Sequence, residues 1–339
     1  MNKLIISLLA AGISLYAQAP KKGYTVVKET LESPALAKNG MGARSKVKVS
    51  VYLPASYHVE PTRRFPVVYF IYGYQEPDFP TSNSSGSLTG YMPAALESAM
   101  GSQGMREFIL VEPSDTNPLT TTFFVNSAAV GAYEDYVTQD LVAFIDGKFR
   151  TLPEAASRGL AGQASSGMSA LNIALRNPQV FSAVFALSPT LLAPQAADKK
   201  SGTFDRKTLS SWGSNYRTAY GAFYSPDLNL KAPHARIPQF DGSEADQKVI
   251  QDWERGMGQF PEKIKAYQAR TEKLTHIGLL VGDKGKFPRF VDGAKAFAQA
   301  LQEAGISHSL KFYNGDREQP MAFIDNHFVP FFSRHLKAQ

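Results

Sequence analysis

The clearest indication of the fold is the segment Arg158-Gly159-Leu160-Ala161-Gly162-Gln163-Ala164-Ser165-Ser166-Gly167. Residues 158–162 read as a short buried strand, and residues 168–176 have the pattern of the helix that follows it. Gly162 and Ser166 lie two residues before and two residues after Ala164, where a sharp strand-to-helix turn needs small side chains. The stretch therefore predicts a strand, a tight turn centred on Ala164 and a helix.

Strand-length apolar segments alternate with segments of helical periodicity from about residue 46 to the end of the chain. This alternation is typical of the α/β class, with a mostly parallel sheet covered by helices. We expect a single domain over residues 20–339. The predicted strands are 46–53, 67–71, 108–111, 158–162, 182–187, 277–281 and 309–313, and the predicted helices are 134–149, 168–176, 294–304 and 323–336.

Residues 190–275 form an insertion, because they interrupt the alternation and contain no strong strand signal. We expect a helix near 245–270, and aromatic residues gather in the first half of the insertion. Two interpretations stay open: the insertion is a lid whose aromatic side chains contact a ligand, or these side chains only pack it against the sheet. The aromatic residues are Phe204, Trp212, Tyr216, Tyr220, Phe223 and Tyr224.

Residues 1–19 have the charged, apolar and small-residue zones of a bacterial-type secretory signal peptide. The apolar run is shorter than the roughly 20 residues that a membrane span needs. Pro20 is a poor residue after the cleavage site, so cleavage after Ala17 is a second possibility. We therefore expect an exported protein, periplasmic or secreted, without a membrane span in its mature form.

The composition excludes several kinds of chemistry. The chain has no cysteine, which excludes a disulfide scaffold, a thiol nucleophile and a cysteine metal site. The six histidines have no paired spacing, so we predict neither a metal nor another cofactor. The net charge of +6 comes from scattered basic residues and not from a patch, so no nucleic-acid partner is expected.

Several segments resemble a known family. The stretch 158–167 and the segment Phe181-Ser182-Ala183-Val184-Phe185-Ala186-Leu187-Ser188-Pro189 resemble the secreted esterase family of the α/β-hydrolase superfamily, which includes feruloyl and acetylxylan esterases, enterochelin esterases and mycolyltransferases. Val51-Tyr52-Leu53-Pro54 resembles the family's early strand, and 123–127 with 133–136 resemble the segment before its long helix. The resemblance spans roughly residues 45–336. It implies an α/β-hydrolase fold with a lid-like insertion and, as activity, serine carboxylester hydrolysis or acyl transfer.

The resemblance places the family's nucleophile at Ala164, which has no oxygen to attack an acyl carbon. Ser165 is a weak substitute, because moving the turn by one residue puts the bulky Gln163 where a small residue is needed. By the same resemblance, the oxyanion donors are backbone amides in Tyr72-Gly73-Tyr74, represented by Gly73 and Tyr74, and the amide of Ser165.

The acid and the base of the family are also altered. The acid follows the strand 277–281, where Asp283 is the candidate, although the aligned position is nearer Gly285. The base follows the last strand, where Arg317 occupies the family's histidine position, and a guanidinium cannot accept a proton from serine. His327 is the nearest downstream histidine and a weak candidate base.

The sequence therefore favours a pseudo-esterase that keeps a pocket for a small ester or carbohydrate ligand but has lost the catalytic triad. One alternative is an active feruloyl- or acetyl-esterase-like hydrolase in which residue 164 was changed from serine to alanine, or which uses Ser165. A second is a non-catalytic adhesion or scaffold protein. A third is rewired catalysis by Arg317, Asp316 or Tyr74.

Overall fold

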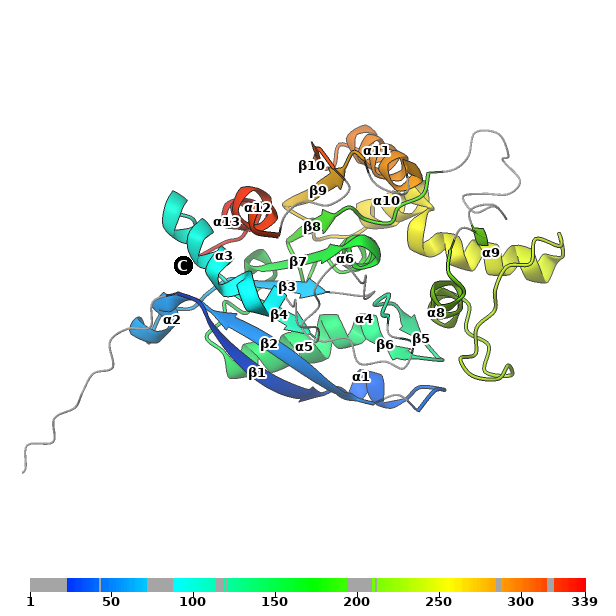
Figure 1. Ribbon diagram of the computed structural model, residues 1–339, viewed down its shortest axis with the longest axis horizontal. Helices are drawn as coiled ribbons and strands as arrows, with labels where there is room; N and C mark the ends of the chain where they lie inside the picture. Colours follow the sequence, from blue (N-terminus) through cyan, green and yellow to red (C-terminus); the bar gives the residue numbers. More distant parts are fainter. Residues whose placement is uncertain are drawn as a thin grey trace, which may run out of the picture.

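The structure is a computed structural model that describes residues 23–42, 44–71, 88–113, 119, 121–193, 209–210, 212–284, 288–315 and 320–339. Its centre is an eight-stranded sheet in the order β1-β2-β4-β3-β7-β8-β9-β10 (Figure 1). Strands β1 and β2 run antiparallel to their neighbours and the other pairs are parallel, which confirms the α/β class with a mostly parallel sheet. The strands are β1 (Thr25–Glu32), β2 (Lys46–Leu53), β3 (Val67–Ile71), β4 (Ile109–Pro113), β7 (Arg158–Gln163), β8 (Ala183–Leu187), β9 (His276–Gly282) and β10 (His308–Tyr313).

The central strands are buried on both faces, which explains why they read as continuous apolar runs. In β3 every residue is buried, and alternate side chains belong to different core clusters. Val67, Tyr69 and Ile71 face one layer of helices, while Val68 and Phe70 face the other. Each face of the sheet is therefore covered by its own set of helices.

One layer contains α3 (Leu88–Gln103), α12 (Pro320–Phe323), the π-helical turn η3 (Ile324–Phe328) and α13 (Val329–His335). The other layer contains α4 (Tyr133–Asp135), the π-helical turn η1 (Tyr136–Asp140), α5 (Leu141–Lys148), α6 (Ala164–Arg176), α10 (Phe260–Gln268) and α11 (Pro288–Glu303). Shorter elements are α1 (Pro34–Ala37), α2 (Ala55–Val59), the pair β5 (Asn126–Ser127) and β6 (Gly131–Ala132), and a 3-10 turn, η2 (Ala155–Ser157). Among the described helices none is both long and apolar enough to cross a membrane.

The structure departs from the sequence prediction in a few elements. The helix expected near 245–270 is two helices, α9 (Glu244–Met257) and α10, because Gln259 between them has a φ of 55°. Strand β1 was not predicted, since as an edge strand it is half exposed and shows no clear apolar alternation. Helix α3 was also not predicted, because Pro93 lies inside it.

The aromatic residues of the insertion form a packed core. Helices α8 (Ser214–Tyr224) and α9 extend beyond the carboxyl ends of β3 and β7 (Figure 1). Trp212, Tyr220 and Trp253 are buried, and the rings of Tyr220 and Phe123 meet edge to face with centroids 4.9 Å apart. For the described aromatic side chains the packing interpretation is therefore favoured over a ligand-contacting lid, whereas Phe204 lies outside the described residues.

Two histidines lie against each other where β9 begins and α13 ends. The rings of His276 and His335 stack with centroids 4.3 Å apart and planes 2° apart. Partial burial, followed by the nearby charges of His276 and Arg334, lowers the pKa of His335 from 6.5 to about 4. The pKa of His276 is lowered as well, by burial first and then by His308 and Arg334. The fold therefore favours the neutral forms of both rings.

This contact predicts a loss of stability in acid. Because the folded pKa of His335 lies below the unfolded value, its contribution is complete above pH 6.5 and is lost as the pH falls from 6.5 towards 4. We expect this loss to be about 1 kcal/mol, a value discounted for solvent screening. Urea unfolding at pH 7 and at pH 4.5 measures it. His335→Gln should flatten the pH dependence; equal pH dependence in wild type and His335→Gln would contradict the prediction.

Candidate functional site

Ala164 occupies a sharp turn between β7 and α6, at the carboxyl edge of the sheet. Its φ is +49°, in the left-handed region that residues with a Cβ rarely adopt. Gly162 makes the turn possible, because a Cβ on this residue would lie 2.3 Å from the carbonyl oxygen of Ser166. The structure therefore has the strained strand–turn–helix geometry that the sequence predicted, with Ala164 at its apex.

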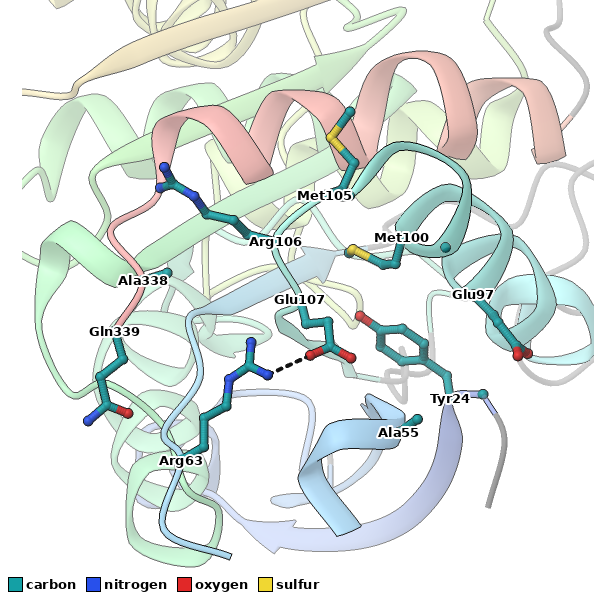
Figure 2. A pocket seen from close by; sticks show the side chains of 13 residues that line it. Tyr24, Ala55, Arg63, Glu97, Met100, Met105, Arg106, Glu107, Ala338 and Gln339 are labelled. Atoms are coloured by element: carbon teal, nitrogen blue, oxygen red, sulfur yellow. Dashed lines mark ion pairs between the residues drawn. The ribbon is translucent and has the colours of Figure 1, made fainter. Parts of the chain in front are cut away.

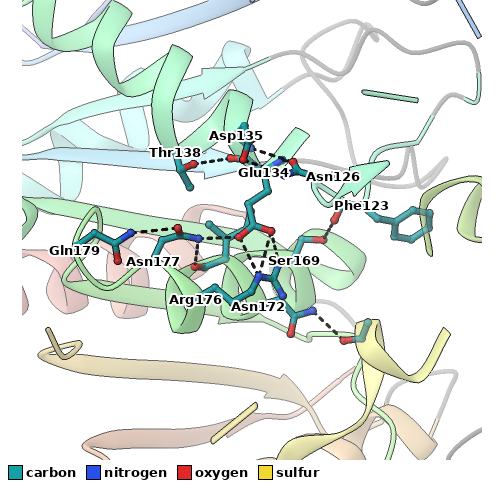
Figure 3. Close-up of polar contacts among 12 residues, drawn as sticks. Phe123, Asn126, Glu134, Asp135, Thr138, Ser169, Asn172, Arg176, Asn177 and Gln179 are labelled. Atoms are coloured by element: carbon teal, nitrogen blue, oxygen red, sulfur yellow. Dashed lines mark hydrogen bonds and ion pairs between the residues drawn. The ribbon is translucent and has the colours of Figure 1, made fainter. Parts of the chain in front are cut away.

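Helix α6, which carries the turn, is attached to its surroundings by three polar side chains along its length (Figure 3). Ser169 donates to the carbonyl of Phe123 at 2.6 Å, and Asn172 donates to the carbonyl of Gly256 in α9 at 2.9 Å. Arg176 contacts both carboxylate oxygens of Glu134, the shortest contact being 2.6 Å. Because these partners come from separate segments, the position of α6 is fixed along its whole length.

Glu134 itself is held by the segment that precedes it. The side-chain oxygen of Asn126 accepts from the amides of Glu134 and Asp135, at 2.9 and 3.2 Å. Asn177 donates to Glu134 at 2.8 Å, next to the Arg176 contact. The segment that carried part of the family resemblance therefore supports the helix of the turn.

Ser165 is not at the apex of the turn. It lies in the first turn of α6, it is buried with 2% exposure, and its carbonyl oxygen is 3.0 Å from the Ser169 hydroxyl. A nucleophile must be accessible to an acyl carbon. The burial of Ser165 therefore argues against its use as a substitute for the missing serine.

The strand beside β7 ends in a second strained residue. Ser188 follows β8 and has a φ of +41°. Its hydroxyl lies 3.2 Å from the hydroxyl of Tyr313 and accepts from the amide of Gly282 at 3.3 Å. We did not predict a role for Ser188, because its backbone strain and its contacts with β9 and β10 cannot be read from the sequence; its position directly after a buried strand was the one available signal.

Asp283 lies at the same edge, directly after β9, and is exposed. Its carboxylate accepts from the amide of Gly315 at 3.0 Å, and its own amide donates to the carbonyl of Tyr313 at 3.1 Å. Within the described part of the chain its hydrogen-bond partners are thus backbone groups. The contacts join the loop after β9 to the loop after β10, the two loops in which the resemblance places the acid and the base.

The remaining predicted site residues divide into two groups. His327 lies in η3, between α12 and α13, and burial, followed by the charge of Lys311, lowers its pKa and favours the neutral ring. Gly73, Tyr74, Gly285, Asp316 and Arg317 lie outside the described residues. The structure therefore groups Ala164, Ser165 and Asp283 at one edge of the sheet, while the roles of Gly73, Tyr74, Arg317 and His327 stay predictions.

A separate cavity of about 640 Å³ lies at the opposite edge, near the C-terminus (Figure 2). Its lining includes Arg63, which precedes β3, and Arg106 and Glu107, which precede β4. Arg63 forms an ion pair with Glu107 at 2.9 Å, and Arg106 donates to the carbonyl of Leu336 at 3.3 Å. Because its arginines are engaged by the chain and it lies across the sheet from Ala164, we do not assign the esterase-like site to it.

The described residues contain no group of three or more histidine, aspartate or glutamate side chains arranged to hold a metal ion.

Comparisons with known proteins agree with the α/β fold described above. The family model described as "Putative esterase" matches residues 41–323, and the chain belongs to this esterase family. No curated protein sequence matches the chain. Solved structures similar to the chain include esterases, and the predicted α/β-hydrolase fold is confirmed.

Three of these structures are informative. A ferulic acid esterase has a TM-score of 0.60 and 18% identity, covering 93% of this chain and 100% of its own. An S-formylglutathione hydrolase from Agrobacterium tumefaciens has a TM-score of 0.58 and 15% identity, covering 95% and 99%. A serine-to-alanine mutant of the feruloyl esterase module from Clostridium thermocellum, complexed with sinapinate, has a TM-score of 0.53 and 13% identity, covering 95% and 92%.

The close approach at the turn can be tested by adding one methyl group. We expect Gly162→Ala to lower the free energy of unfolding by roughly 2–3 kcal/mol, because the new Cβ overlaps the backbone of Ser166. Gly147→Ala in α5 is the matched control: a Cβ there meets nothing within 4 Å. The control substitution should leave the free energy of unfolding unchanged or raise it by up to about 1 kcal/mol. Chemical denaturation measures both variants, and equal stability would refute the packing argument.

Proposed function

We propose that this member of the esterase family does not hydrolyse esters through the family's serine chemistry and instead binds an acyl-ester or ester-bearing carbohydrate ligand at the turn around Ala164. The observation that carries the proposal is the residue at the apex. A methyl group occupies the place where serine hydrolases present a hydroxyl, yet the strained backbone of the turn is retained.

The groups that would activate a nucleophile support the same conclusion. The sequence after β10 reads Tyr313-Asn314-Gly315-Asp316-Arg317 and provides no histidine at the family's base position. Asp283, the candidate acid, is hydrogen-bonded to backbone groups of the β10 loop. A serine hydrolase needs an acid that orients a base, and a base that accepts the serine proton. On this proposal both functions were lost together with the nucleophile.

The related structures support the choice of ligand. The C. thermocellum mutant carries alanine in place of a serine and is complexed with sinapinate, so a protein of this fold with such a substitution holds an aromatic acyl compound. Another relative is described as a ferulic acid esterase. We therefore propose phenolic acyl esters and acetylated sugars as the first ligands to test. The signal-like residues 1–19 support export to the periplasm or the medium, where such polysaccharide-linked esters occur.

The alternative of an active esterase has one structural argument against it. Ser165 would have to act from a buried position in α6, and its exposed fraction is 2%. A change of serine to alanine in an otherwise intact enzyme predicts instead that restoring the serine restores turnover. The scaffold alternative predicts that Ala164→Phe, which fills the site, leaves partner binding unchanged.

The deciding experiment compares the wild-type protein with Ala164→Ser and Ser165→Ala. Each is assayed for hydrolysis of 4-nitrophenyl acetate, acetylated xylan and methyl ferulate, and methyl ferulate binding is measured by calorimetry. We expect saturable binding by the wild type and no turnover above background in any of the three proteins, because the proton-transfer groups are absent as well as the nucleophile.

Three results would overturn the proposal. Turnover by Ala164→Ser at least about 10³-fold above background would show an intact acid and base, since a working triad accelerates such reactions by far more than that. Turnover by the wild type that disappears in Ser165→Ala would show that Ser165 is the nucleophile. A wild type that neither binds nor turns over any of these esters would exclude the ester-binding function.

A further inference from the structure

Two hydroxyl groups meet at the carboxyl edge of the sheet. They belong to Ser188, after β8, and to Tyr313, the last residue of β10, and the two oxygens are 3.2 Å apart. Gly282 in β9 lets the tyrosine reach this far, because a Cβ on Gly282 would lie 3.0 Å from the ring and hydroxyl of Tyr313. We call Ser188 and Tyr313 the hydroxyl pair.

One member of the hydroxyl pair, Ser188, lies on the strand end next to Ala164. Gln163 and Leu187 are register partners in β7 and β8, so the residues that follow them, Ala164 and Ser188, leave adjacent strands side by side. Adjacent strands are about 4.8 Å apart. The amide of Thr190 donates to the carbonyl of Ala164 at 3.2 Å, so the loop that carries Ser188 contacts the turn directly.

Both neighbouring residues have left-handed backbone conformations, with φ values of 49° for Ala164 and 41° for Ser188. Such a conformation costs a residue with a Cβ about 1 kcal/mol and persists where the surrounding structure imposes it, most often at functional sites. Two adjacent strained strand ends at one edge of the sheet therefore indicate a shaped site, and Ser188 contributes a hydroxyl to it.

The hydrogen bonds orient the Ser188 hydroxyl. Its oxygen accepts from the amide of Gly282. When Tyr313 donates to the same oxygen, both lone pairs of Ser188 are occupied and its hydrogen can be donated elsewhere. A donor held in this way suits a carbonyl oxygen, which has lone pairs and no hydrogen of its own.

We propose that the Ser188 hydroxyl, oriented by Tyr313 and Gly282, donates a hydrogen bond to the acyl carbonyl oxygen of a ligand ester held at Ala164. This assignment rests on the proposed function and names the group that selects an ester over an analogue without a carbonyl. Ser188 recognises the ligand and Tyr313 positions Ser188; neither takes part in bond cleavage.

The test uses calorimetry with two probes, methyl ferulate and coniferyl alcohol, which has a similar aromatic ring but no carbonyl oxygen. We expect Ser188→Ala to weaken methyl ferulate binding about fivefold, the value of one neutral hydrogen bond, and to leave coniferyl alcohol binding unchanged. Tyr313→Phe should give a smaller loss for the ester alone. Alanine keeps the Cβ of Ser188, so the substitution removes the hydroxyl without relieving backbone strain.

Controls separate a local effect from a general one. Tyr24→Phe removes a buried tyrosine hydroxyl that donates to Phe108 at the opposite edge, and it should change binding of neither probe. Circular dichroism verifies that each variant is folded. If Ser188→Ala does not fold, Ser188→Gly replaces it, because glycine adopts a positive φ without strain.

The outcomes distinguish this proposal from the one on which it rests. If the wild type binds methyl ferulate and Ser188→Ala binds it with the same affinity, the proposed role of Ser188 is overturned and the ester-binding function is not. Equal weakening of both probes would also overturn it, since that result indicates a purely structural hydroxyl. No binding by the wild type would overturn both proposals.

Discussion

The close approach of Gly162 to the carbonyl of Ser166 is the constraint on which the site depends. With no side chain at Gly162, helix α6 can start immediately after β7, and the chain reverses within one residue. This reversal forces Ala164 into the left-handed region and presents its side chain at the edge of the sheet. The shape of the turn is thus set by backbone packing and not by the residue at its apex, so the turn can be retained when the apex residue has no reactive group.

Helix α6 transmits this constraint to the rest of the layer. Ser169, Asn172 and Arg176 bind the segment before β5, helix α9 and helix α4, respectively. The carboxyl edge receives further loops from β8, β9 and β10, which are joined to one another through Ser188, Asp283 and Tyr313. The site is therefore a junction of four neighbouring strand ends. Strands β7, β8 and β9 are buried, and the edge strand β10 is held by its parallel pairing with β9.

Much of this arrangement could be predicted from the sequence. The buried strands were readable because β3 is a continuous apolar run and β7 has small and apolar residues between Arg158 and Gln163. The turn was readable because Gly162 and Ser166 have the required spacing. Strand β1 was missed because only its tertiary pairing with β2, not its own pattern, makes it a strand. The break between α9 and α10 was missed because it depends on the left-handed conformation of Gln259. A glutamine in the sequence gives no signal for that conformation. Ser188 was missed for the same reason: what distinguishes it is a backbone angle and two contacts from other strands.

The carbonyl of Gly256 has a consequence for how a ligand reaches the site. It accepts from both Asn172 of α6 and Lys263 of α10, so α9 is attached to the helix of the turn. Moving α9 away would break both bonds and separate the Trp253 ring of α9 from the Tyr220 ring of α8, a combined cost on the order of 4 kcal/mol. A displaced α9 would then be present in about one molecule in a thousand. On the proposed function, a ligand would therefore associate at the turn with α9 in place, and binding would not wait for α9 to move aside.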